Sequence, residues 1–139
     1  MEIKLVTGVI GEDVHNIGIK VLEHAFKREG FKVVSLGIRV SPEDFINAAI
    51  ETKADGIMIS SLSGHAEVLV EGFREKCTEA GLGNILIYIG GHLYIGDEKW
   101  PDMEKMFKDK GFDRVYPAST LPGEVITALK EDFGKRGLM

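Results

Sequence analysis

Short apolar runs alternate with segments of helical periodicity along the whole chain. Five of the runs are rich in Val, Ile and Leu and have the length of buried strands; they span residues 3–10, 32–38, 56–62, 85–91 and 114–117. Five helical segments follow them in turn, at residues 16–30, 41–53, 66–81, 100–111 and 122–134. This alternation predicts an α/β fold in which a parallel sheet is covered by helices on both faces.

Local signals fix two of the predicted helices more closely. The first is amphipathic, and its expected apolar face consists of Ile17, Val21, Leu22, Ala25 and Phe26. In the second, Ser41 is the expected N-cap and Pro42 the expected first helical position. Asp44 would then lie in the first turn.

The carboxyl ends of the predicted strands carry the polar residues that stand out. A doubly wound, flavodoxin-like sheet of order 2-1-3-4-5 binds ligands outside these ends, near its switch point between the first and third strands. Three of the four histidines, His15, His65 and His92, fall on this edge, whereas His24 lies in the middle of a predicted helix. The asymmetry predicts a binding edge.

Composition narrows the class of protein. The chain has 139 residues, and we expect a single domain spanning residues 1–139. The contents of hydrophobic (44%) and charged (28%) residues are ordinary for a soluble globular protein. A net charge of −5 without a Lys/Arg cluster argues against nucleic-acid or membrane partners. Cys77, the single cysteine, excludes an intrachain disulfide, and the opening "MEIKLVTGVI" does not resemble a signal peptide, so we expect a cytoplasmic location.

Several common sites do not fit the loops at this edge. The first loop is neither a P-loop nor a G-x-G-x-x-G dinucleotide cradle. Serines and "YPAST" stand where a phosphorelay receiver needs an Asp and a Lys. There is no G-x-S-x-G elbow, and Cys77 has no histidine nearby in the sequence, so nucleophilic catalysis has little support.

The pair Asp13-x-His15 remains after these exclusions. In an extended loop, residues two apart point the same way, so the Asp13 carboxylate can accept a hydrogen bond from the His15 imidazole. A metal-binding histidine commonly has such a partner, which fixes its tautomer. Equally, Asp13 can cap the following helix and leave His15 as a solvent-exposed residue of its first turn. The spacing alone leaves both interpretations open.

A longer pattern surrounds this pair. Asp13-x-His15-x-x-Gly18 is followed after 41 residues by Ser60-x-Leu62 and after 27 more by Gly90-Gly91. In order, spacing and position the three parts resemble the D-x-H-x-x-G, S-x-L and G-G signature of cobalamin-binding domains. Within that superfamily the chain resembles the small subunits of glutamate mutase over nearly its whole length, for example in "AAIETKADGIMISSL" and "WPDMEKMFKDKGFDRVY".

The resemblance implies a cofactor and its ligands. The cofactor would be adenosylcobalamin, with His15 as the lower axial ligand of cobalt and Asp13 as the hydrogen-bond partner of that imidazole. The displaced nucleotide tail would enter a slot between the sheet and the first helix. The implied cofactor-binding residues, with none catalytic in this subunit, are Glu12, Asp13, Val14, His15, Asn16, Gly18, Ser60, Ser61, Leu62, Gly90, Gly91, His92, Leu93, Tyr94, Ile95 and Gly96.

The resemblance also implies a reaction and a partner. The reaction would be the radical interconversion of L-glutamate and (2S,3S)-3-methylaspartate. One small domain cannot also enclose the substrate, whereas a TIM barrel of about 250 residues can. We therefore expect an isomerase that is inactive without a large catalytic subunit, with two small and two large subunits in a heterotetramer.

Some features leave alternatives open. Glu12, His65 and His92 depart from the residues usual in the family, which affects fine tuning more than cofactor binding. Ser60 and Ser61 could simply end a buried strand, and Gly90-Gly91 could form a tight turn. Three other functions are a corrinoid carrier for a methyltransferase or a subunit of a related mutase, a zinc domain using His15, His65 and His92, and a cofactor-free interaction domain.

Overall fold

Five parallel strands form one sheet in the order β2-β1-β3-β4-β5. In the computed structural model, which describes residues 2–11, 17–61, 66–91, 93 and 100–139, they are β1 (Lys4–Val9), β2 (Lys32–Ser35), β3 (Gly56–Ser61), β4 (Leu86–Gly91) and β5 (Arg114–Pro117). The helices are α1 (Ile17–Arg28), α2 (Pro42–Thr52), α3 (Ala66–Leu69), α4 (Phe73–Glu79), α5 (Trp100–Asp109) and α6 (Pro122–Lys135). The predicted fold class and strand order are confirmed.

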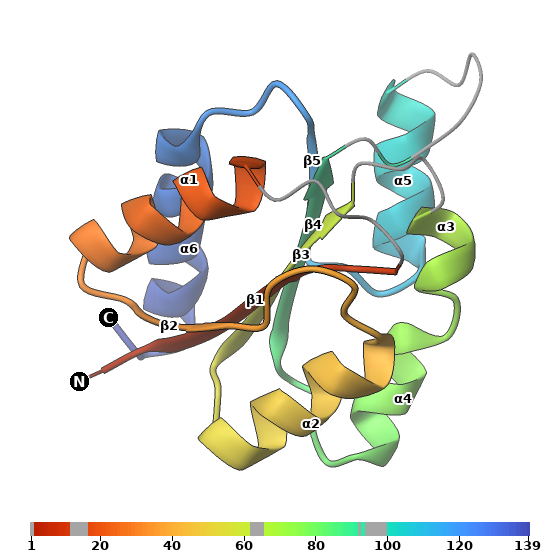
Figure 1. Cartoon of the computed structure of the whole chain (residues 1–139), viewed down its shortest axis with the longest axis horizontal. Coiled ribbons are helices and arrows are strands. Elements are labelled where there is room, and N and C mark those ends of the chain that lie inside the picture. Colours follow the sequence, from red (N-terminus) through yellow and green to blue (C-terminus); the bar gives the residue numbers. More distant parts are fainter. Residues whose placement is uncertain (1, 12–16, 62–65, 92, 94–99) are drawn as a thin grey trace.

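The helices cover the two faces of the sheet unequally (Figure 1). Helices α1 and α6 lie together on one face, over a core that includes Leu5, Phe26, Met58 and Phe133. The other face carries α2, α3, α4 and α5 over a larger core centred on aromatic and branched side chains. None of the helices in the described ranges is long and apolar enough to cross a membrane.

Two details of the elements differ from expectation, and one is confirmed. The predicted third helix is two helices, since Gly72 between α3 and α4 adopts a positive φ of 74°. Strand β2 ends at Ser35 instead of residue 38, because Gly37 and Arg39 also have positive φ and interrupt the pairing before Val40 bridges to Ile10. The start of α2 is confirmed, with Ser41 and Asp44 forming a capping box.

The buried face of α1 agrees with the predicted one only in part, and the side chain of Ile17 lies outside the described ones. Val21 is 52% exposed, whereas Ile19 and Glu23 are buried. Phe26 is buried as expected, and Leu22 and Ala25 are partly buried. A face made of residues 19, 22, 23 and 26 has the same helical spacing as the predicted one, but it is rotated and includes a carboxylate. His24 is exposed, as predicted.

Candidate cofactor site

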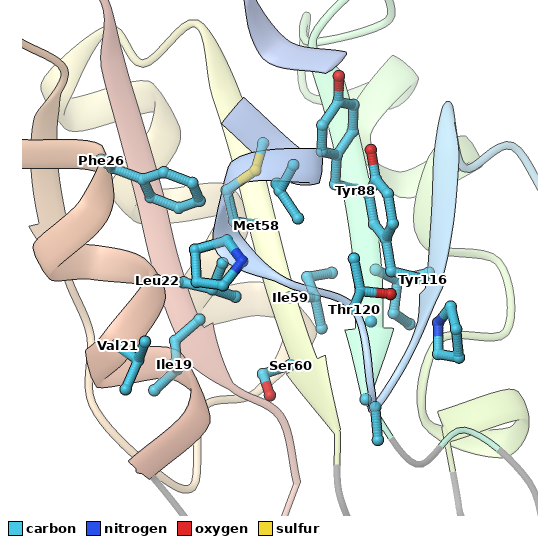
Figure 2. Close-up of a pocket in the computed structure, with 17 residues that line it drawn as sticks. Ile19, Val21, Leu22, Phe26, Met58, Ile59, Ser60, Tyr88, Tyr116 and Thr120 are labelled. Carbon is cyan, nitrogen blue, oxygen red and sulfur yellow. The ribbon is translucent and has the colours of Figure 1, made fainter. Parts of the chain in front are cut away.

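A cavity of about 250 Å³ lies between the sheet and the two helices α1 and α6. Figure 2 shows side chains of α1 on one side of it, Tyr88 and Tyr116 on the other, and Met58 and Ser60 of β3 between them. Its lining is mostly apolar, with few polar groups. The residues that line it are Ile19, Val21, Leu22, Phe26, Met58, Ile59, Ser60, Tyr88, Ile89, Gly90, Gly91, Tyr116, Pro117, Ala118, Thr120, Pro122 and Val125.

The sheet register builds the floor of this cavity. Ser60 pairs with Gly90, and Gly90 pairs with Tyr116. Residues paired in this way lie side by side on one face of a sheet. Two residues further back, Met58 pairs with Tyr88 on the same face. The floor is thus two rows deep, and in the row nearer the carboxyl edge Gly90, which has no side chain, lies between the hydroxyl-bearing residues Ser60 and Tyr116.

The two glycines of the predicted motif have different structural roles. A Cβ added at Gly90 would lie 3.3 Å from Tyr116 Cβ and 3.4 Å from the Tyr116 carbonyl oxygen, so the absence of a side chain keeps this part of the floor open. Gly91 has a φ of 111°, which favours glycine for backbone reasons. Both residues belong to the end of β4, so they do not form a separate tight turn.

A hydrogen-bonded cluster surrounds the hydroxyl of Tyr88, one of the residues that line the cavity. The Tyr88 hydroxyl donates to Asp132 of α6, and Arg114 donates to the same carboxylate through Nε at 2.8 Å and Nη2 at 2.9 Å. The pKa of Asp132 lies below its usual value, chiefly because Arg114 donates to it. Burial, together with the adjacent Asp132 carboxylate, raises the pKa of Tyr88. Tyr88 is therefore neutral and a fixed donor at physiological pH.

Tyr116 lies beside this cluster without joining it. Its ring centroid is 5.7 Å from that of Tyr88, and burial raises its pKa to about 12. Its hydroxyl is buried and has no hydrogen-bond partner within the described part of the chain. The cavity wall therefore contains a buried tyrosine, Tyr88, whose hydroxyl is hydrogen-bonded, and a partly buried one, Tyr116, whose hydroxyl has no partner among the described residues.

The structure brings together some of the sequence-predicted residues and separates others. Ser60, Gly90 and Gly91 all line the cavity. Ser61 is fully buried and, by strand alternation, faces the opposite side of the sheet, where its hydroxyl has no partner among the described residues. Leu93 is also fully buried in the core on that opposite side, and Gly18 lies in the first turn of α1.

The remaining predicted residues lie outside the described ranges: Glu12, Asp13, Val14, His15, Asn16, Leu62, His92, Tyr94, Ile95 and Gly96. The same holds for His65, so the proposed zinc set of three histidines falls entirely outside them. Within the residues that are described, no group of three or more His, Cys, Asp or Glu side chains could hold a metal ion.

Sequence reasoning missed most of the cavity wall. Met58 and Tyr88 could have been found, because each lies two residues before a motif position, Ser60 or Gly90, and so on the same face of its strand. The contributions of α6, such as Val125, could not, because nothing local in the sequence specifies which face of the sheet this helix covers.

The lining fits the nucleotide end of a corrinoid. Apolar and aromatic walls suit a flat, weakly polar base, and the Ser60 hydroxyl supplies one hydrogen-bonding group near the carboxyl edge of the sheet. The open floor at Gly90 leaves space beside that hydroxyl. The described residues that line the cavity include no cluster of cations that would select a free phosphate instead.

Comparison with known proteins identifies the family. Residues 3–116 match the model of the B12 binding domain, so fold, cavity and sequence together define a protein of the B12-binding class. The "Glutamate mutase sigma subunit" of Clostridium tetani is 55% identical over 129 residues, which cover 93% of this chain and 94% of that protein. The protein of the same name from Carboxydothermus hydrogenoformans is 52% identical over 133 residues, 96% of this chain and 97% of the relative. The chain belongs to the family of glutamate mutase sigma subunits.

Solved structures with the same fold are more distant in sequence. A cobalamin-binding protein from Desulfitobacterium hafniense DCB-2 superimposes with a TM-score of 0.74 at 20% identity, over 93% of this chain and 58% of that one. The Methanosarcina barkeri monomethylamine corrinoid protein gives a TM-score of 0.70 at 20% identity, over 92% of this chain and 57% of that one. The chain thus spans less than two thirds of these structures, and at such identities the likeness concerns the fold alone.

Proposed function

We propose that the protein is the cobalamin-binding small subunit of an adenosylcobalamin-dependent glutamate mutase, which interconverts L-glutamate and (2S,3S)-3-methylaspartate. The observation that carries the proposal is the position of Ser60 and Gly90, two motif residues, on the floor of the cavity between the sheet and α1. The chain is 55% and 52% identical to two glutamate mutase sigma subunits over more than nine tenths of its length. This similarity supports the mutase reaction over the function of a methyl-carrying corrinoid protein.

In this proposal the described residues hold the nucleotide tail. The Ser60 hydroxyl would donate to a ring nitrogen of the base, Gly90 would leave room for its edge, and Leu22, Phe26 and Met58, which line the cavity, would contact its faces. His15 would bind cobalt with Asp13 as its hydrogen-bond partner, and residues from Glu12 to Asn16 and from His92 to Gly96 would contact the corrin ring. When bound, adenosylcobalamin supplies the radical chemistry of the rearrangement, and the protein binds and orients it.

The proposal includes a partner. Residues 1–139 act as a single cytoplasmic domain that binds the cofactor, and a large TIM-barrel subunit binds the amino acid and excludes water from the reaction. Two copies of each form a heterotetramer. The purified chain with cofactor alone should therefore convert no glutamate. Turnover without a partner would contradict this part of the proposal.

The assignment of His15 is tested by the EPR spectrum of cob(II)alamin mixed with the protein. With ¹⁵N-labelled histidine the nitrogen hyperfine splitting should change, and in His15→Ala the histidine splitting should disappear. If cobalamin binds but its splitting ignores the label, the cofactor's own base stays on cobalt and the axial-ligand assignment is wrong. Methyl transfer to a thiol acceptor, without glutamate-dependent radical formation, would favour the corrinoid carrier.

A further inference from the structure

Glu23 is a buried carboxylate in the middle of α1. Its exposure is 6%, and it receives a hydrogen bond from the hydroxyl of Thr7 in β1, a residue that is fully buried. Burial of a carboxylate is unfavourable unless donors satisfy its oxygens. No Lys or Arg in the described ranges forms an ion pair with Glu23, so Thr7 is the donor that compensates it there.

This bond lies at the margin of the cavity. Thr7 pairs with Met58, whose side chain is on the cavity floor. On α1, Glu23 has cavity-lining neighbours one residue before it at Leu22, one turn before it at Ile19 and three residues after it at Phe26. A displacement of α1 at Glu23 would therefore move these three side chains, which together with Val21 form one wall of the cavity.

Few other polar contacts hold this helix in place. Among the described residues, Thr7 to Glu23 is the one side-chain hydrogen bond between α1 and a strand. The ion pair of Lys130 with Glu29, at 2.8 Å, ties the turn after α1 to α6, but both partners are substantially exposed. Apolar contacts resist separation of a helix from a sheet, but they restrain sliding less than a directional hydrogen bond does.

We infer that Glu23 is a positioning residue for the nucleotide end of the cofactor. Through its bond with Thr7 it fixes α1 against β1 and so sets the width of the cavity between α1 and the β3–β4 floor. The inference rests on the proposed function, because it assigns a ligand to that cavity. The inference also predicts different effects on two parts of a corrinoid. A change in the cavity wall should affect binding of the nucleotide tail and not binding of the corrin ring.

The test removes the hydroxyl without changing side-chain size. Thr7→Val deletes the donor, Thr7→Ser keeps it, and Lys130→Gln is the control that breaks the exposed ion pair near the same helix. Equilibrium dialysis then measures the affinity of each protein for adenosylcobalamin and for adenosylcobinamide. Adenosylcobinamide has the same ring and upper ligand but no nucleotide tail.

We expect Thr7→Val to weaken adenosylcobalamin binding by about ten-fold or more and adenosylcobinamide binding by less than about two-fold. Thr7→Ser and Lys130→Gln should bind both like the wild type. Equal losses for both corrinoids would indicate a merely structural role and overturn the inference, as would unchanged affinities in Thr7→Val. If the wild type binds neither corrinoid at millimolar concentration, the proposed function fails and the inference fails with it.

Discussion

Ser60 and Gly90 are paired across β3 and β4, so a hydroxyl group lies next to a position with no side chain on the floor of the cavity. The pair combines a hydrogen-bonding group with space for the atom that it would bind. Neither half is useful alone, because a larger residue at position 90 would fill the space in front of the hydroxyl.

Gly90→Ala is therefore expected to weaken cobalamin binding by at least ten-fold, since the new methyl group would lie 3.3 Å from Tyr116 Cβ and occupy the floor. Gly134→Ala is the control: this glycine lies in α6 with open space around it, and alanine should stabilise the helix by about 0.5–1 kcal/mol. Absorbance titration with cobalamin and urea unfolding measure the two effects. Unaltered cobalamin affinity in Gly90→Ala would contradict the placement of the base.

The two cavity tyrosines should respond oppositely to loss of the hydroxyl. Tyr88→Phe removes a donor to Asp132 and should lower the free energy of unfolding by about 1–2 kcal/mol. Tyr116→Phe removes a buried hydroxyl that has no partner in the described part of the chain, so its effect should be neutral or stabilising by up to about 1 kcal/mol. Urea unfolding at neutral pH compares them. Equal losses in both variants would mean that Tyr116 is hydrogen-bonded.

Asp132 should make stability depend on pH in the acidic range. Because Arg114 donates to it, the pKa of Asp132 is lower in the folded protein than in the unfolded chain. The unfolded chain therefore binds more protons in this range, and the stabilising contribution is present above the unfolded value and is lost as pH falls through the folded one. The free energy of unfolding of Asp132→Asn should fall less steeply than that of the wild type between about pH 5 and 2. Parallel curves would contradict the assignment.

Arg74 should be the most sensitive charged residue on the other face of the sheet. Its guanidinium donates to the carbonyl oxygens of Gly83, Ile85 and Gly111 and to the carboxylate of Asp113, at 2.8–3.1 Å. Lysine cannot reach this set of acceptors, so Arg74→Lys should cost about 2 kcal/mol of unfolding free energy. The control Lys76→Gln breaks an exposed ion pair with Glu43 and should change stability by less than about 0.5 kcal/mol. Similar losses in the two variants would refute a special role for Arg74.

The order of the elements could be predicted from the sequence because it depends on local periodicity. Strand β5 begins and ends at the predicted residues, and the capping box at Ser41 and Asp44 forms as its residue types indicate. The end of β2 could not be predicted, because Arg39 adopts a positive φ that its residue type does not favour.

The candidate site was predictable along the strands and not on the helices. Motif residues of β3 and β4 reach the cavity because strand alternation fixes which way they face. The buried face of α1 was predicted with Val21 on it and without Glu23, since polarity suggested that a glutamate belongs on the surface. Among the described residues it is the distant Thr7, sixteen residues earlier, that donates to this buried carboxylate.

The two walls of the cavity come from α1, which precedes four of the five strands, and α6, which follows all of them (Figure 1). During synthesis, the sheet and the core on the α2 side can assemble from residues already made. The cavity between the sheet and the two helices then still lacks the wall formed by α6. On the proposed function, a nascent chain that has not yet released α6 from the ribosome lacks the second helix that would enclose the tail of a corrinoid, so loading of the cofactor is expected late in the maturation of this protein.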